Sequence, residues 1–197
     1  DVNISNAVKT GENELVVRVE DEELRNRPSG KQYYGNAKGI WQTVYLEGRS
    51  DNYITHIKFT PDIDNRKVTV ELFLHEEAGQ PLEFSLSGKN NSLNYSGQIT
   101  ANESSAQFVV PVENMKLWDI ENPFLYEVNA KITGRNYFDE VSSYFGMRKI
   151  SAVEVPGKDF QYVALNNKPV YMNLALDQSY HPEGFYTFPS DQFMKEE

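Results

Sequence analysis

The stretch Lys116–Val128, which reads KLWDIENPFLYEV, decides the fold of this chain. Every second residue from Phe124 onward is bulky and apolar, and this period of two is typical of a β-strand. Pro123 has no N–H to donate to a sheet, so it belongs at the entrance of that strand and not inside it. Turn-forming residues separate the proline from Trp118. A buried tryptophan at a corner, followed at once by a strand, predicts one end of a β-sandwich.

Strand patterns of the same kind recur on both sides of this stretch, and no stripe of apolar residues at helical spacing interrupts them. The seven predicted strands are 53–60, 67–75, 82–87, 93–100, 106–112, 124–133 and 137–145. We therefore predict one immunoglobulin-like β-sandwich over residues 51–147, since seven short strands in about 100 residues are typical of that class. Asp62, Asp64 and Asn65 could suggest a calcium site. Their spacing lacks the glycine and the distal glutamate of an EF-hand loop, so we interpret them as turn formers.

The first 50 residues predict two further strands on either side of a long loop. Apolar residues alternate over Leu15–Val19, which predicts a strand. Residues 21–38 are charged and contain glycine and proline, a pattern that favours a surface loop. Bulky side chains occupy both faces of Ile40–Leu46, which predicts a strand covered on both sides. The polar break Arg49–Asn52 marks the boundary before the sandwich.

Residues 148–197 change character again. Two short strands are predicted at 148–154 and 160–164, followed by a turn at 166–169. Val170–Leu176 is an almost continuous apolar run, which predicts a buried strand of the parallel type. Ser190 and Asp191 predict the start of a helix, with the serine as N-cap and the aspartate favoured by the helix dipole.

Composition narrows the classes of function. The chain has 197 residues, a net charge of −10 and no cysteine, so disulfides and thiolate metal sites are excluded. The acidic balance disfavours nucleic acid and anionic membranes as partners and is compatible with a neutral sugar. No apolar run reaches the roughly 20 residues that span a bilayer, and no motif for a metal or cofactor is present. The chain begins without a methionine or a signal sequence, which indicates an internal starting point. A periplasmic or secreted location is the expectation.

Four motifs follow one another along the chain: Gly30–Gln32 with Gly39–Glu47, then Leu117–Tyr126, Phe145–Ile150 and Leu165–Tyr171. This series resembles glycoside hydrolase family 2, the group of β-galactosidases and β-glucuronidases. The resemblance implies that residues 1–50 are the C-terminal part of a jelly-roll sugar-binding domain. It implies an immunoglobulin-like domain at 51–147 and the truncated start of a catalytic (β/α)8 barrel, its first β/α unit, at 148–197. The family's two catalytic glutamates lie on later barrel strands, beyond Glu197, so the resemblance implies no catalytic residue in this chain.

Substrate contacts are expected after the predicted barrel strand. Where the family usually runs LRGVNRHEDHP, this chain has Met172–Pro182, in which only His181 and Pro182 are kept. Asp177, Gln178 and His181 are the candidate substrate-binding residues, because barrel enzymes build their sites at the C-terminal ends of their strands. Packing of the loop is an equal alternative for these side chains.

Adjacent carboxylates do not predict catalysis here. A retaining glycosidase needs two carboxyl groups about 5–5.5 Å apart, whereas neighbours on a strand point to opposite faces. We interpret the adjacent pairs as solvated; they are Glu22–Glu23, Glu76–Glu77 and Glu196–Glu197. We expect a non-catalytic middle segment of a β-galactosidase-like hydrolase of carbohydrate metabolism, whose partner is the carbohydrate substrate of the parent enzyme. Self-association through exposed strand edges is a further expectation. The alternative is a stand-alone immunoglobulin-like carbohydrate-binding or adhesion module.

Overall fold

The computed structural model describes residues 2–20, 39–40, 42–135, 137–176, 181, 183–184 and 187–196. The chain divides into two compact units. One unit is Glu47–Asn173, and the other combines Asp1–Leu46 with Leu174–Glu197.

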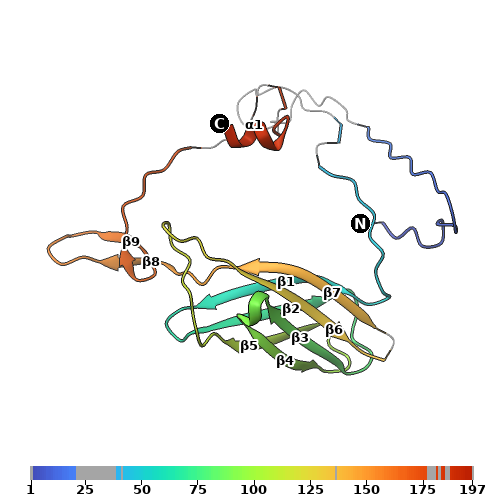
Figure 1. Cartoon of the computed structure of the whole chain (residues 1–197), viewed down its shortest axis with the longest axis horizontal. Coiled ribbons are helices and arrows are strands. Elements are labelled where there is room, and N and C mark those ends of the chain that lie inside the picture. Colours follow the sequence, from blue (N-terminus) through green and yellow to red (C-terminus); the bar gives the residue numbers. More distant parts are fainter. Residues whose placement is uncertain are drawn as a thin grey trace. The chain divides into compact units, whose positions relative to one another are not determined.

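The unit Glu47–Asn173 contains seven antiparallel strands that form its main body (Figure 1). They are β1 (Ile54–Asp62), β2 (Lys67–Leu74), β3 (Leu82–Gly88), β4 (Asn94–Ile99), β5 (Ser105–Pro111), β6 (Tyr126–Thr133) and β7 (Phe138–Phe145), with the short 3₁₀ turn η1 (Lys89–Asn91) after β3. All seven strands predicted for the sandwich are confirmed. Their bounds differ from the predicted ones by no more than two residues at either end. The alternation of buried and less buried side chains is clearest in β2, β3 and β6.

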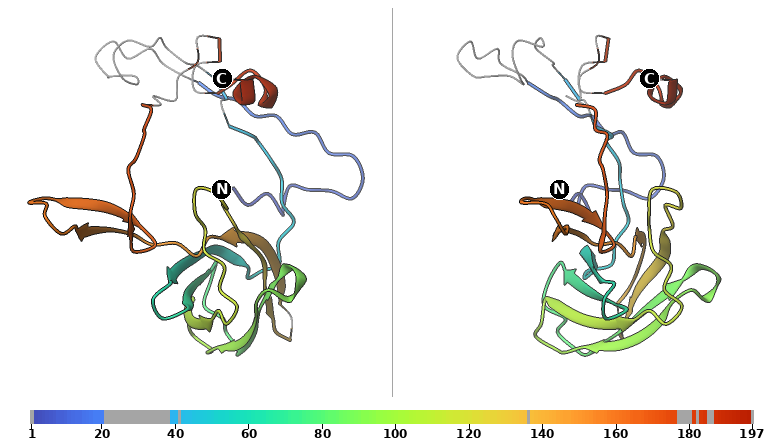
Figure 2. Two further views of the ribbon diagram at one scale, coloured as in Figure 1. Left: turned by 60° about the vertical axis from the view of Figure 1, so that its left-hand side comes forward. Right: turned by 90° about the vertical axis from the view of Figure 1, so that its left-hand side faces the viewer.

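The strands form two sheets that face each other around one core (Figure 2). One sheet has the order β1-β2-β5, and the other has the order β4-β3-β6-β7. Every second residue is buried along β2, β3 and β6, so each sheet contributes one apolar face. The largest fully buried side chains come from both sheets and include Leu72, Phe84, Val110, Tyr126 and Ile132. The chain is therefore mainly β, and this unit is built around a β-sandwich.

Two buried polar side chains fix the entrance of the sandwich. The Asn52 amide donates to the carbonyl oxygens of Glu76 and Glu77 at 3.1 and 3.3 Å, and its Oδ1 accepts the Glu76 N–H at 3.1 Å. Asp139 on β7 accepts the Ile54 N–H at 2.9 Å. Both side chains are paired, as burial of a polar group requires. The predicted polar break before the sandwich is thus the place where β1 is anchored.

A small three-stranded sheet follows the sandwich within the same unit. Its strands are β8 (Ile150–Glu154), β9 (Gln161–Leu165) and β10 (Lys168–Pro169), in the order β10-β9-β8. Asn166 and Asn167 form the two-residue connection of β9 to β10, with φ of 51° and 66°. Hairpin loops of this length favour the primed turns, and type I′ has positive φ at both central residues, a conformation that asparagine tolerates. The two strands and the turn predicted here are confirmed.

The strands predicted in the other parts of the chain are wrong. Leu15–Val19, the described part of Ile40–Leu46, and residues 171–176 lie outside any strand. Their large apolar side chains are exposed, as Val16 at 77% and Leu174 at 83% show. Alternation makes a segment competent to pair, but a strand also needs a neighbour, and the described residues offer these segments none. The jelly-roll strands and the first barrel strand are therefore not seen. The predicted loop at 21–38 lies outside the described residues.

The predicted helix start is confirmed. Helix α1 spans Asp191–Glu196, and the Ser190 hydroxyl accepts the Phe193 N–H at 3.2 Å, as an N-cap does. Among the described residues there is no helix of a length and hydropathy suited to crossing a membrane.

Candidate functional site

The structure describes one of the three residues predicted to contact substrate. Asp177 and Gln178 lie outside the described residues. The His181 side chain is buried, and its Nδ1 accepts the N–H groups of Glu183 and Gly184, both at 3.1 Å. Its ring packs against Phe188 and Phe193, with centroid distances of 5.6 and 4.6 Å. These contacts support the loop-packing alternative for His181. A sugar contact by any of the three residues stays a prediction.

The stretch that decides the fold forms a corner between β5 and β6. Trp118 was predicted to be buried, but it is only half-buried there. Its indole packs against the chain that leaves β7 and not inside the core. A Cβ on Gly146 would lie 3.2 Å from the Trp118 Cβ, so glycine permits this close approach. The Trp118 N–H donates to the Met147 carbonyl at 3.0 Å. The Arg148 guanidinium lies 4.8 Å from the indole ring, a cation–π contact.

Tyr126 is the aromatic residue of this stretch that belongs to the core. Its side chain is 2% exposed, and its ring stacks on Phe145 at a centroid distance of 5.1 Å. Its hydroxyl oxygen accepts the Lys116 N–H at 2.7 Å. A tyrosine at the start of the sixth strand that bonds back to the chain upstream is the tyrosine corner of immunoglobulin-like sandwiches. The signal for it, a tyrosine three residues after Pro123, was present in the sequence.

Asp62 organises the turn from β1 to β2, as the turn interpretation predicted, and Asp64 lies in the same turn. Asp62 accepts hydrogen bonds from the side chain and the backbone N–H of Asn65, which together lower its pKa. The pKa of Asp64 is also lowered, first by the Lys149 ammonium and then by the Asn167 amide. Both carboxylates are therefore held in the charged form. A general acid for glycoside cleavage needs the opposite shift.

The β9–β10 turn meets this corner through its side chains. The Asn166 amide donates to the Trp118 carbonyl at 2.9 Å, and the Asn167 amide donates to Asp64 at 2.7 Å. The Lys149 ammonium lies 2.5 Å from the other oxygen of Asp64. Residues from three separate parts of the unit thus converge on one polar joint.

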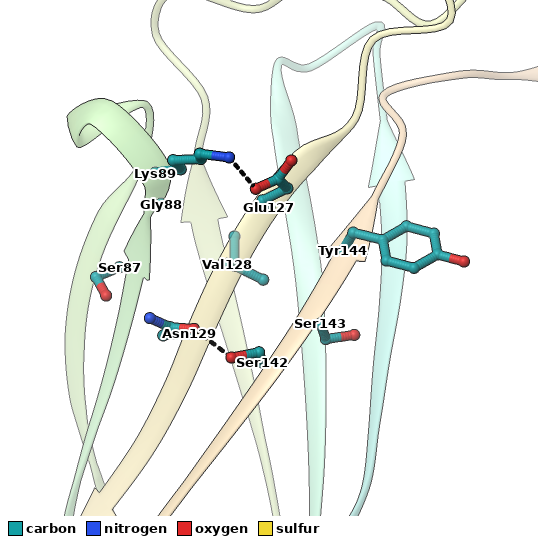
Figure 3. A pocket seen from close by; sticks show the side chains of 9 residues that line it. All are labelled: Ser87, Gly88, Lys89, Glu127, Val128, Asn129, Ser142, Ser143 and Tyr144. Carbon is teal, nitrogen blue, oxygen red and sulfur yellow. Dashed lines mark hydrogen bonds and ion pairs between the residues drawn. The ribbon is translucent and has the colours of Figure 1, made fainter.

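A shallow hollow of about 380 Å³ lies on the outer face of the four-stranded sheet (Figure 3). The Lys89 ammonium pairs with Glu127 at 2.6 Å, and the Ser142 hydroxyl donates to Asn129 at 2.7 Å. Tyr144 projects at its rim and is 65% exposed. Because these polar groups satisfy one another and face water, the hollow is the solvated side of an antiparallel sheet. It brings together no catalytic constellation.

Histidine and carboxylate side chains are the possible metal ligands in the described part of the chain. No group of three or more histidine, aspartate or glutamate side chains is placed there to hold an ion. His56 is exposed on β1 and contacts Phe73, and the exposed His75 follows the end of β2 and stacks on Tyr53. The carboxylates of Glu76 and Glu77 are exposed, in agreement with the solvated interpretation.

The fold and the joint define a class: a β-sandwich domain whose last strand leads into a hairpin that is fastened to it. The model of the family "Glycosyl hydrolases family 2" matches residues 52–148, the sandwich and its exit. Over residues 52–148 this match confirms the resemblance to glycoside hydrolase family 2.

Two relatives illustrate the match. A β-galactosidase from Thermoanaerobacterium thermosulfurigenes is 28% identical over 151 residues, which cover 70% of this chain and 21% of that protein. The structure of a β-glucuronidase from Ruminococcus gnavus in complex with uronic deoxynojirimycin matches with a TM-score of 0.44 and 19% identity, over 62% of this chain and 19% of that one. The chain therefore spans about a fifth of the length of these relatives.

Proposed function

We propose that this chain is a non-catalytic middle segment of a β-galactosidase-like family 2 enzyme that hydrolyses O-glycosidic bonds in carbohydrates. The family match on residues 52–148 carries the proposal, because it falls on the sandwich and its exit. The name of the relative from Thermoanaerobacterium thermosulfurigenes supports a galactoside as the substrate class. In this proposal residues 1–50 end the sugar-binding domain, 51–147 are the immunoglobulin-like domain, and 148–197 begin the catalytic barrel.

The chemistry of the carboxylates supports a non-catalytic role for the sandwich. Asp62 and Asp64 have lowered pKa values and are occupied by the Asn65, Lys149 and Asn167 contacts. Retaining cleavage requires one carboxyl group that is still protonated near neutral pH beside a second that is ionised. The alternative of a stand-alone carbohydrate-binding or adhesion module would need a surface with polar groups available to a ligand. The paired groups of the sheet hollow do not favour it.

Two preparations test the proposal. Purified chain 1–197 should not hydrolyse 4-nitrophenyl β-galactoside, whereas the complete protein that contains it should. Turnover by the chain that is lost on mutation of any of its own carboxylates would refute the non-catalytic assignment. No turnover of any aryl β-glycoside by the complete protein would refute the assignment to a glycosidase.

The substrate contact by Asp177 is tested in the complete protein. A charged acceptor of sugar hydroxyls contributes about 1.5–3 kcal/mol per hydrogen bond, so Asp177→Ala should lower kcat/KM by about tenfold or more. The thermal midpoint should change little. Asp159→Ala, in the exposed loop between β8 and β9, is the matched control and should alter neither quantity. A loss of stability without a kinetic effect would retire the assignment of Asp177.

A further inference from the structure

The turn Asn166–Asn167 uses its side chains for more than the turn itself requires. Both residues have positive φ, and glycine adopts that conformation at least as readily as asparagine does. The two side-chain amides are nevertheless both engaged outside the hairpin, on the Trp118 carbonyl and on the Asp64 carboxylate. The amide contacts are thus an addition to the turn and connect it to the sandwich.

The chain between the sandwich and the hairpin enters the same network. The Lys149 N–H donates to Asn166 Oδ1 at 3.0 Å, and the Lys149 carbonyl accepts the Asn166 N–H at 2.8 Å. The Lys149 ammonium pairs with Asp64. Met147, two residues earlier, is fully buried and accepts the Trp118 N–H. The connection is therefore held on the sandwich before the hairpin begins.

From this geometry we infer that Asp64, Lys149, Asn166, Asn167 and the Trp118 carbonyl form a latch. This latch sets the orientation of the small β8–β10 sheet, with its β9–β10 hairpin, on the sandwich. Three attachments from two elements restrict rotation about the connection, which a single contact would not. The charged partners are substantially exposed, 47% for the Asp64 side chain and 38% for that of Lys149. Exposed ion pairs contribute little to the free energy of folding. The latch accordingly governs orientation and leaves the stability of the sandwich almost unchanged.

The latch itself does not depend on the proposed function, but its effect on the reaction rests on that function. In a family 2 enzyme the segment after Pro169 would lead into the catalytic barrel, so the latch would fix the direction in which the barrel starts. Asp64 and the two asparagines would then be positioning residues, which act on the reaction through the placement of the barrel and not through contact with the sugar.

The absence of cysteine permits a direct test on the chain 1–197. Gln107→Cys on β5 and Gln161→Cys on β9 replace exposed residues. Spin labels on the two cysteines allow their distance to be measured by pulsed electron–electron double resonance. The labelled chain should give one narrow distance distribution. The double variant Asn166→Gly, Asn167→Gly keeps the turn and removes both amides, and it should give a clearly broader distribution at an unchanged thermal midpoint.

The matched control is Asn90→Gly with Asn91→Gly. These neighbouring asparagines also have positive φ, at 57° and 56°, but they lie in η1 and take no part in the latch. The control should keep the narrow distribution. Two results would refute the proposed latch. One is a narrow distance distribution in the Asn166→Gly, Asn167→Gly variant, and the other is a broad distance distribution in the chain with its natural asparagines.

The complete protein separates the latch from the proposed function. There the Asn166→Gly, Asn167→Gly variant should lower kcat more than it changes KM for 4-nitrophenyl β-galactoside. The single variant Asn166→Asp, with Asn167 kept, should give a kcat below that of the natural pair. An unchanged kcat together with a broadened distance distribution would overturn the positioning role alone. Absence of any glycosidase activity in the complete protein would refute the proposed function, while the distance measurement would still decide the latch.

Discussion

Tyr126→Phe is the most specific test of how the corner stabilises the sandwich. The change keeps the ring, its stacking on Phe145 and its edge contact with Phe124, with centroids 5.1 and 5.0 Å apart. It removes only the hydroxyl oxygen that accepts the Lys116 N–H at 2.7 Å. Loss of such a bond at a partly buried donor costs about 1–2 kcal/mol. In a domain of roughly 100 residues, each kcal/mol lowers Tm by about 4–8 °C.

Urea denaturation followed by tryptophan fluorescence measures this cost, since Trp118 reports on the same corner. The midpoint should fall while the denaturant slope m stays constant, because the surface exposed on unfolding is unchanged. Tyr144→Phe is the matched control: this tyrosine lies on the outer face of β7 and is 65% exposed. A loss below about 0.5 kcal/mol for Tyr126→Phe, or one equal to that of the control, would refute the role of the hydroxyl.

Two further outcomes follow from the corner. Trp118→Ala should lower the free energy of unfolding by about 2 kcal/mol, because the indole is half-buried. A fully buried tryptophan would cost roughly 3–5 kcal/mol. A loss above about 4 kcal/mol in the same urea titration would mean that the indole is a core residue. The Asn65 contacts lower the pKa of Asp62, so its ionised carboxylate stabilises the folded state above its ordinary pKa of about 4, and that contribution is lost as pH falls through the lowered value. The thermal midpoint should therefore drop below about pH 4, and less steeply in the variant Asp62→Ala; identical pH profiles would contradict this.

The sandwich could be predicted from sequence because its information is local and repeated. Each of β2, β3 and β6 buries alternate residues, so the period of two that the sequence displays is the period that the core imposes. The turns are marked equally well, by residues such as Asp62 and Asn166 whose side chains or backbone favour them. Local signals of this kind need no knowledge of which strand pairs with which.

Segments that depend on a partner could not be predicted in the same way. Leu15–Val19 and Val170–Leu176 carry strand patterns, yet neither lies in a strand of the structure. An alternating pattern indicates that a segment can pair and bury one face. A strand forms only where a neighbouring strand is present to pair with it. The burial of Trp118 is smaller than predicted for a related reason. The size of the indole predicts burial, but its neighbours Gly146 and Arg148 decide how much of it is covered.

The polar contacts of the corner were missed for a geometric reason. Asn167 and Asp64 are 103 positions apart, and no local pattern indicates that their side chains meet. The candidate substrate residues are a different case. His181 has a described packing role, and the roles of Asp177 and Gln178 depend on residues around them that the described ranges do not include.

The two-residue turn at Asn166–Asn167 also has a kinetic consequence. A hairpin closed by such a turn forms in about 1–10 μs. The sandwich must first join distant strands, as where Lys67 on β2 meets Pro111 on β5, and topologies of this kind fold in roughly milliseconds to seconds. The hairpin is therefore ready long before the Asp64 turn and the Trp118 corner exist to receive it. We therefore expect its attachment to the sandwich to be a late step of folding, because both of these parts must exist before the contacts can form.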